Sequence, residues 1–374
     1  MAKLRYVGVE CANSFTKSFT DDREPLVYPN TTTEIKDTYY TDNQFSTKEN
    51  VSATPFNVTR EESNEDTFDL NTIYTYKGVN YRIGHTKSSE SSSSNDVERY
   101  FQPTYERELI TALANSCDDD DAIIFTTGIP SAHYNYREDI EKSLNEKFVG
   151  EHTIKINGKS KTFTILKAHC ILQPLGTFYY TFLQLDGTPY LQMVERYTGN
   201  RVLVADLGWG TSDIASIFDF ALDSVLPSRL HRAAKDYNRA LLNEINISFK
   251  DSGLGNAEID LLDLDTQLRE NNNHIVYGNE TYDVSEIVEK VKPAFVAELA
   301  KELKKDYTPD DYDTFIFTGG STALFEKELV ENFKNRFKNR LNNNIVFVED
   351  SQIANARGYF LHAKYLSDNS AVLA

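Results

Sequence analysis

The feature that most constrains the fold of this chain is a pattern of strand and turn that occurs in both halves. An apolar run, Val7–Val9, ends at Glu10, and a second apolar run, Leu203–Ala205, ends at Asp206. Short apolar runs bounded by turn residues predict buried strands, and segments with helical periodicity separate the predicted strands in each half. The sequence therefore predicts an α/β protein of two similar domains with a cleft between them. Ligands of such sheets bind at the carboxyl ends of the strands.

The composition excludes several classes of protein. With 39 basic and 57 acidic residues among 374, the net charge is −18, which argues against a surface that binds nucleic acid directly. The three cysteines are widely spaced and odd in number, so reduced thiols are expected. The sequence contains no apolar stretch of the ~18 residues that a transmembrane helix needs. We therefore expect a cytoplasmic protein with no membrane partner and no direct contact with nucleic acid.

A run of four acidic residues, Asp118–Asp121, follows a predicted helix. A metal site is conceivable there, but adjacent carboxylates repel one another and point in different directions. The run is therefore predicted to be a solvated loop between a helix and a strand.

Two segments have the residue types that bind phosphate and magnesium. After the first strand, residues 10–17 combine a carboxylate, small polar residues and Lys17, so amides and hydroxyls could hold phosphate oxygens while the lysine neutralises them. After the second strand, Asp206 is followed by Gly-Trp-Gly-Thr at 208–211, where the glycines permit close approach of the backbone to a ligand. A carboxylate held at a strand end is a ligand for hydrated Mg²⁺. Each segment, taken alone, could also be a purely structural hairpin.

Two further turns complete the set of candidate segments. Thr318–Thr322 places a double glycine between a strand and a helix, where a flat ring could lie on the backbone beside a helix N-terminus. Gln173–Gly176 is predicted as a strand-to-helix turn that offers Gln173 as a neutral group able to orient a water molecule.

Together with Ala354–Gly358, these segments occur in an order that resembles the superfamily of actin, the heat-shock chaperone ATPases and the sugar kinases. The resemblance spans nearly the whole chain. Within the superfamily the chain most resembles the ParM-like bacterial actins of plasmid segregation, through Phe125–Pro130, Gln173–Gly176 and the 354–358 segment. The resemblance implies an actin-like, ribonuclease H-like ATPase fold, with a nucleotide cleft between duplicated domains.

The resemblance also implies domain boundaries. The first domain would comprise residues 1–198, with a polar small-subdomain insertion at about 20–90, and would be completed by the C-terminal helix 353–374. The second domain would comprise residues 199–352, with a small subdomain at about 228–305.

Roles follow from the resemblance residue by residue. Glu10 and Asp206 would hold hydrated Mg²⁺, Gln173 would place the attacking water, and Asp206 would polarise it. Lys235 lies in a segment, Ala233–Asn238, that weakly echoes a nucleotide-binding motif of the family. The residues implied to bind the nucleotide are Asn13, Ser14, Thr16, Lys17, Gly208, Trp209, Gly210, Thr211, Lys235, Gly319, Gly320 and Ser321.

Three residues depart from the family's pattern. Glu10 replaces the usual aspartate, so the carboxylate moves by one methylene, and Ala12 replaces a usual glycine. Trp209, the single tryptophan, stands where a small residue is usual; it would either cap the nucleotide pocket or pack outside the hairpin. None of these changes removes a required charge, so Mg²⁺-dependent hydrolysis of ATP is expected, with GTP as a possible substitute.

The leading functional hypothesis is a nucleotide-dependent, filament-forming ATPase that segregates plasmid DNA through an adaptor protein bound to centromeric DNA. The polar stretch 20–70 is either a filament contact or a variable loop. One alternative is a monomeric small-molecule kinase of the same superfamily, although no sugar-site signature is found. Another is a cell-division or chaperone-like ATPase scaffold, although the end of the chain, 363–374, is short and not basic.

Overall fold

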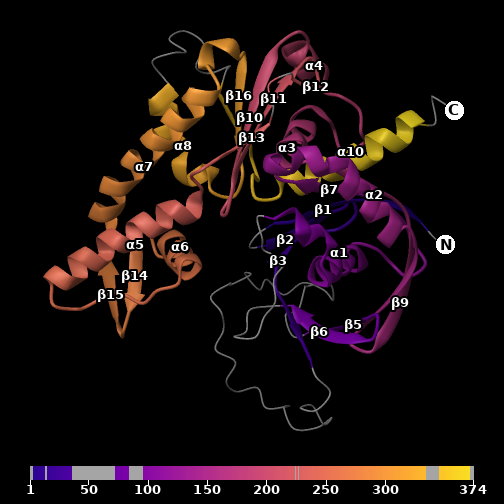
Figure 1. The fold of residues 1–374 in the computed structure, drawn as a ribbon, viewed down its shortest axis with the longest axis horizontal. Helices are drawn as coiled ribbons and strands as arrows, with labels where there is room; N and C mark the ends of the chain where they lie inside the picture. The colour runs from indigo at the N-terminus through magenta and orange to yellow at the C-terminus, as the bar shows by residue number, and fades with distance from the viewer. Residues whose placement is uncertain are drawn as a thin grey trace.

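The computed structural model describes residues 3–12, 15–35, 72–83, 96–223, 225, 227–333 and 345–370. These residues form two lobes, each built around its own β-sheet (Figure 1). Within the described residues the first sheet has nine strands, in the order β3-β2-β1-β7-β9-β8-β5-β6-β4. The second has six, of which β12-β11-β10-β16-β17 form a path and β13 pairs with β11. The predicted α/β class is confirmed, whereas the domain boundaries stay predictions.

The two sheets repeat the same central arrangement. In the first lobe, β1 pairs antiparallel with β2 and parallel with β7. In the second lobe, β10 pairs antiparallel with β11 and parallel with β16. Each lobe therefore has a central strand followed by a hairpin, as the duplicated sequence pattern predicts. Glu10 near the end of β1 and Asp206 near the end of β10 occupy corresponding places.

The first lobe takes its sheet and helices from the N-terminal half of the chain. Its strands are β1 (Leu4–Cys11), β2 (Phe15–Phe19), β3 (Leu26–Pro29), β4 (Thr32–Glu34), β5 (Ile73–Tyr76), β6 (Val79–Ile83), β7 (Ala122–Ile129), β8 (Gly150–Ile156) and β9 (Lys159–Leu172). Its helices are η1 (Val97–Phe101), α1 (Pro103–Asn115), η2 (Ser131–Tyr136), α2 (Arg137–Phe148) and α3 (Gln173–Phe182), whereas the next helix, α4 (Leu191–Tyr197), lies beside the second sheet (Figure 1). Turns at Gly78 and Gly158 join β5 to β6 and β8 to β9 as antiparallel hairpins.

The second lobe contains the rest of the chain up to the last helix. Its strands are β10 (Arg201–Leu207), β11 (Ser212–Phe218), β12 (Ala221–Leu222), β13 (Ser228–Leu230), β16 (Thr314–Thr318) and β17 (Ile345–Phe347), with a separate hairpin of β14 (His274–Tyr277) and β15 (Glu280–Asp283). Its helices are α5 (Ala234–Asp251), α6 (Leu261–Glu270), α7 (Ser285–Asp306), η3 (Pro309–Asp311) and α8 (Thr322–Phe333). Helices α5 and α6 and the β14–β15 hairpin lie together away from the second sheet (Figure 1).

The last helix, α10 (Ala354–Ser370), follows the second sheet in sequence but returns to the first lobe, where it packs against α3, β1 and β7 (Figure 1). The contact is close because glycines line it: a Cβ at Gly8 would collide with the backbone of Ala356, and a Cβ at Gly358 would collide with the backbone of Gly176. This packing brings the first turn of α10 to the cleft between the lobes.

The two lobes share an apolar core at the base of the cleft. Phe19 and Phe178 of the first lobe, Val204 and Ile316 of the second, and Phe360 of α10 belong to one buried cluster. Because this cluster continues from one lobe through α10 into the other, it holds the strand ends of the two sheets opposite each other.

Some elements differ from what the sequence predicts. Helical periodicity predicts a helix from Ser228 to Ile245, but Ser228–Leu230 forms β13 and α5 begins only at Ala234. This part of the prediction was wrong because β13 gains its stability from pairing with β11, which local periodicity does not report. Helix α6 was not predicted.

The acidic run 118–121 is only in part the solvated loop that was predicted. Asp121 is 3% exposed and accepts a hydrogen bond from the buried guanidinium of Arg5, which also pairs with Asp22 and Asp118. Burial alone would raise the pKa of Asp121, but the bonds from Arg5 and from backbone amides hold that pKa below its usual value. The prediction failed here because the partner, Arg5, lies more than a hundred residues away in sequence.

Other predictions have simple outcomes. Most of the polar stretch 20–70, and Asn13 and Ser14, lie outside the described residues. The three cysteines are buried and unpaired. Of the helices in the described part of the chain, none combines the length and the apolar character needed to cross a membrane.

Candidate functional site

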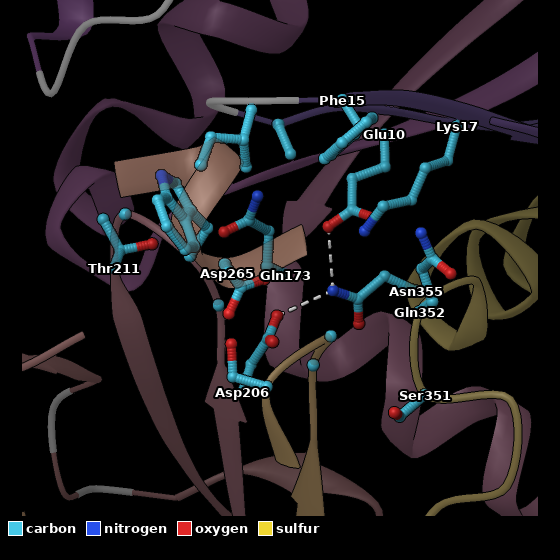
Figure 2. A pocket seen from close by; sticks show the side chains of 18 of the residues that line it. Glu10, Phe15, Lys17, Gln173, Asp206, Thr211, Asp265, Ser351, Gln352 and Asn355 are labelled. Carbon is cyan, nitrogen blue, oxygen red and sulfur yellow. Dashed lines mark hydrogen bonds and ion pairs between the residues drawn. The ribbon is translucent and has the colours of Figure 1, made fainter. Parts of the chain in front are cut away.

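A cavity of about 270 Å³ lies between the lobes at the carboxyl ends of the central strands. Figure 2 shows its walls, with Glu10, Lys17 and Gln173 from the first lobe, Asp206 and Thr211 from the second, and Asn355 between them. The predicted site residues that line it are Glu10, Lys17, Gln173, Asp206, Gly208, Trp209, Gly210, Thr211, Gly319, Gly320 and Ser321. Tertiary structure therefore gathers most of the predicted site from segments spread over the whole chain.

Two buried carboxylates stand at the centre of the cavity. Glu10 is 4% exposed and Asp206 is 6% exposed. The Nδ2 group of Asn355 donates to Glu10 Oε1 at 3.1 Å and to Asp206 Oδ2 at 2.7 Å (Figure 2). Lys17 lies opposite Glu10 in the β1–β2 register, and its Nζ is 2.8 Å from Glu10 Oε2. One carboxylate from each lobe is thus held against the same nitrogen, with a cation beside one of them.

The electrostatics of this pair favour a bound cation. Burial, and then the charge of Glu10, raise the pKa of Asp206 well above the usual value of an aspartate. A divalent cation next to the carboxylates would offset both effects. Within the described residues no group of three or more His, Cys, Asp or Glu side chains is placed to hold a metal. Two carboxylates, without a full set of protein ligands, fit Mg²⁺. This ion is usually coordinated by one or two protein carboxylates together with phosphate oxygens and water.

The hairpin after Asp206 is held from two sides. The Gly208 N–H donates to Thr211 O at 2.9 Å, and the first turn of α5 donates to the carbonyls of Gly208 and Trp209. Asp213, opposite Asp206 in the β10–β11 register, accepts the N–H of Ser131 from the first lobe at 2.7 Å. Burial raises the pKa of Asp213 to about 6. The hairpin is therefore a fixed wall of the cavity.

The Gly319–Gly320 turn leaves a stretch of bare backbone at the second wall. Gly319 has φ +95°, and a Cβ there would lie 2.5 Å from Asp206 Oδ1 and from Leu207 O, so only glycine fits. A Cβ at Gly320 would meet no atom within 4 Å. Ser321 directly precedes α8, and its N–H donates to Leu207 O. A flat ring could lie on the open face of Gly320.

Two predicted residues do not line the cavity. Thr16 is fully buried and donates its hydroxyl to Asn30 Oδ1 at 3.0 Å. It faces away because neighbouring residues of a strand point to opposite sides, and Lys17 takes the cavity side. Lys235 contributes its backbone N–H to Trp209 O, at 3.0 Å, in the first turn of α5. For both residues, contact with a ligand remains a prediction that this arrangement does not support.

Comparison with known proteins agrees with this geometry. Residues 37–176 match the family model of the N-terminal domain of actin-like proteins, and no curated protein sequence gives a significant match. The actin-like protein Alp7A superposes with a TM-score of 0.73 at 15% identity, over 99% of this chain and 98% of its own. The chain has the fold of the actin-like proteins. The fold that the sequence resemblance implied is thereby confirmed.

Two further solved structures match the fold of this chain. The archaeal actin homologue Ta0583, in complex with ADP, gives a TM-score of 0.69 at 15% identity, over 99% of this chain and all of its own. A 15-stranded ParM filament from Clostridium botulinum gives 0.68 at 16% identity, over 97% of this chain and 99% of its own.

The cavity also includes residues that sequence reasoning missed. Asp265 and Arg269 of α6 line it, joined to each other at 2.8 Å, and Arg269 also donates to Gly320 O. Arg99 lines it from the first lobe and donates to Cys11 O. Asp265 and Arg269 were missed because α6, the helix that carries them, was not predicted. Asn355 was quoted only as part of a connecting segment, and no local signal marks its two hydrogen bonds.

The structure also bears on the position of Trp209. This residue lines the cavity and is half-buried, which favours the first of the two positions considered, a cap on the pocket.

Proposed function

We propose that this protein is a nucleotide-dependent, polymerising ATPase that binds ATP with Mg²⁺ between its lobes and forms filaments; GTP is a possible substitute. The observation that carries the proposal is the pair of buried carboxylates, Glu10 and Asp206, which face the same cavity from opposite lobes beside Lys17. A nucleoside triphosphate brings several negative charges, and a site that already holds two carboxylates can accept it only together with cations. Glu10 and Asp206 would hold Mg²⁺, directly or through water, and Lys17 would contact phosphate oxygens.

Hydrolysis would depend on the residues that face the phosphates. The bound Mg²⁺ would supply charge neutralisation on the phosphate oxygens. Gln173, the first residue of α3, is 8% exposed and lines the cavity, so its amide would orient the attacking water. Asp206 would accept a hydrogen bond from that water and polarise it. Because phosphoryl transfer depends mainly on positioning and charge, these groups suffice for a slow ATPase.

Filament formation is proposed from the fold and from the filament that one structural match forms. A head-to-tail contact between unlike surfaces generates an open helix and not a closed ring. Binding of ATP across the cleft would fix the angle between the lobes and favour this contact, and hydrolysis would weaken it. Plasmid segregation through a DNA-bound adaptor follows from the sequence resemblance. It agrees with a net charge of −18, which disfavours direct binding of DNA.

Light scattering and pelleting test the proposal directly. Wild-type protein with Mg²⁺ and ATP should scatter and pellet, then disassemble as phosphate is released, whereas protein with ADP or without nucleotide should stay in the supernatant. Asp206→Ala should lower phosphate release at least about 100-fold, as loss of a group that acts in the transition state does. Asp139→Ala, which removes an exposed acid on α2, is the matched control and should hydrolyse ATP normally.

Other outcomes would favour the alternatives. ATP hydrolysis without polymer at any protein concentration would contradict the filament proposal. Stimulation of phosphate transfer by a sugar would favour the kinase, and binding to lipid vesicles would favour the cell-division scaffold.

A further inference from the structure

Asn355 occupies an unusual position at the junction of the two lobes. It lies in the first turn of α10 and is 4% exposed. Its single amide nitrogen donates to one carboxylate of the first lobe and one of the second (Figure 2). An amide NH₂ group has two N–H donors, so Glu10 and Asp206 use both of them.

The orientation of this amide is fixed from its other side. Thr177 Oγ1, on α3, donates to Asn355 Oδ1 at 2.8 Å and lies 3.0 Å from Thr318 Oγ1 of β16. Thr177 and Thr318 are fully buried. The network therefore crosses between the lobes twice, once through the amide nitrogen and once through the two hydroxyls.

The donors that Asn355 presents are those of a hydrated cation. Water molecules bound to Mg²⁺ donate hydrogen bonds to nearby carboxylates, and Mg²⁺ gives up its waters reluctantly. The amide thus supplies the same donors to the same two acceptors, but without the charge of the metal. Without either the Asn355 amide or a hydrated cation, the two buried carboxylates would carry a large desolvation cost.

We propose that Asn355 is a positioning residue that takes the place of the hydrated cation between Glu10 and Asp206 while the cleft is free of metal, with Thr177 holding its amide in register. This inference rests on the proposed function, because it assumes that Mg²⁺ and nucleotide bind in this cavity. When the cation binds, the hydrogen bonds from Asn355 to Glu10 and Asp206 are replaced by contacts with the hydrated cation. Its contribution to stability is therefore confined to the metal-free protein.

Such a contribution has a thermodynamic consequence that a merely structural role lacks. An interaction made only in the metal-free state opposes metal binding by the same factor that it stabilises that state. Asn355→Ala should therefore melt earlier than wild type in EDTA, and should lose most of that difference in saturating ADP and Mg²⁺. In saturating ADP, the Mg²⁺ concentration for half-maximal stabilisation should fall about tenfold, which corresponds to about 1.4 kcal/mol.

Two threonines of α3 supply a matched pair of variants. Thr177→Val removes the hydroxyl that holds the amide and should shift the Mg²⁺ requirement in the same direction as Asn355→Ala, whereas Thr177→Ser should behave as wild type. Thr181→Val makes the same change one turn further along α3, where the hydroxyl donates to Phe178 O, and should leave the Mg²⁺ requirement unchanged.

The experiment is thermal melting of the full chain in EDTA, and in ADP with a Mg²⁺ titration. Equal destabilisation of Asn355→Ala with and without Mg²⁺, or a higher Mg²⁺ requirement, would overturn the inference. If Asn355→Ala does not fold, the Thr177 variants decide, and a Thr177→Val protein with the wild-type Mg²⁺ requirement would overturn it. If ADP and Mg²⁺ do not stabilise the wild-type protein at all, the proposed function fails, and the inference fails with it.

Discussion

Replacement of Gly358 by alanine tests how α10 is held against the first lobe. Gly358 lies in the interior of α10, where alanine is a better helix former than glycine by about 1 kcal/mol. A Cβ there would overlap the carbonyl oxygen of Gly176 and lie 2.9 Å from its Cα. These are backbone atoms in the first turn of α3, so no side-chain rotation relieves the overlap. The two helices would have to move apart by about 1 Å or more, given that packed interiors have no spare room.

The two effects have opposite signs, so the result discriminates between them. Overpacking of a well-filled contact typically costs 1 to 3 kcal/mol and occasionally more, and a backbone-to-backbone overlap belongs at the upper end. Set against the helix gain, Gly358→Ala should lose at least about 2 kcal/mol of the free energy of unfolding. Because the shift displaces Asn355 and Gln173, which lie on these two helices, nucleotide-dependent stabilisation should weaken as well.

Urea unfolding followed by far-ultraviolet circular dichroism measures the effect. Gly320→Ala is the control, because its Cβ would meet no atom within 4 Å and the free energy of unfolding should change by less than about 0.5 kcal/mol. A Gly358→Ala protein as stable as wild type, or more stable, would refute the argument that this glycine is required for packing.

Three further perturbations have definite expected outcomes. Gly320→Val should leave the fold intact but weaken ADP binding about tenfold if the base lies on that backbone, measured by the fluorescence of Trp209; unchanged affinity would place the base elsewhere. Asp121→Asn removes the buried partner of Arg5 and should cost about 2 kcal/mol of unfolding free energy, less than a fully broken buried pair because other acids remain; unaltered urea unfolding would contradict this. Burial lowers the pKa of His362 to about 3. Below pH 6.5 this histidine is therefore protonated in the unfolded chain but stays neutral in the folded chain. Stability should therefore fall as the pH drops from about 6.5 toward 3, by at most about 1.4 kcal/mol per pH unit from this group, and His362→Gln should flatten the curve in urea titrations at pH 7 and 5.

Local patterns predicted the strand ends but not all of their partners. Glu10 and Asp206 could be found because an apolar run that stops at an acid is visible within a few residues. The side of the strand on which a residue lies was harder to predict. Lys17 and Thr16 were both predicted to bind the nucleotide, yet the pleat of β2 turns one to the cavity and the other to Asn30.

The remaining part of the cavity depends on packing between distant segments. Helix α6, which brings Asp265 and Arg269 to the cavity, has a local helix signal that was missed, with Asp260 as its N-cap and leucines at 261, 264 and 268, but nothing local places it at the cavity. Likewise, Asp121 looks like one of four solvated acids until Arg5 is placed against it. Such contacts depend on the tertiary structure. A buried charge is costly unless it is paired with an opposite charge, and that partner can come from any part of the chain.

The sequence by itself determined the α/β class, the duplicated central strands, the order of the ligand-binding turns and the resemblance to the actin-like proteins. Each of these depends on hydrophobic periodicity or on turn residues within short windows. The resemblance also implied that the two carboxylates share a cation, but only the tertiary structure decided that an amide from the last helix lies between them. The physical reason is that α10 returns across the molecule to the first lobe, where glycine contacts on β1 and α3 allow close packing, and no local pattern specifies that return.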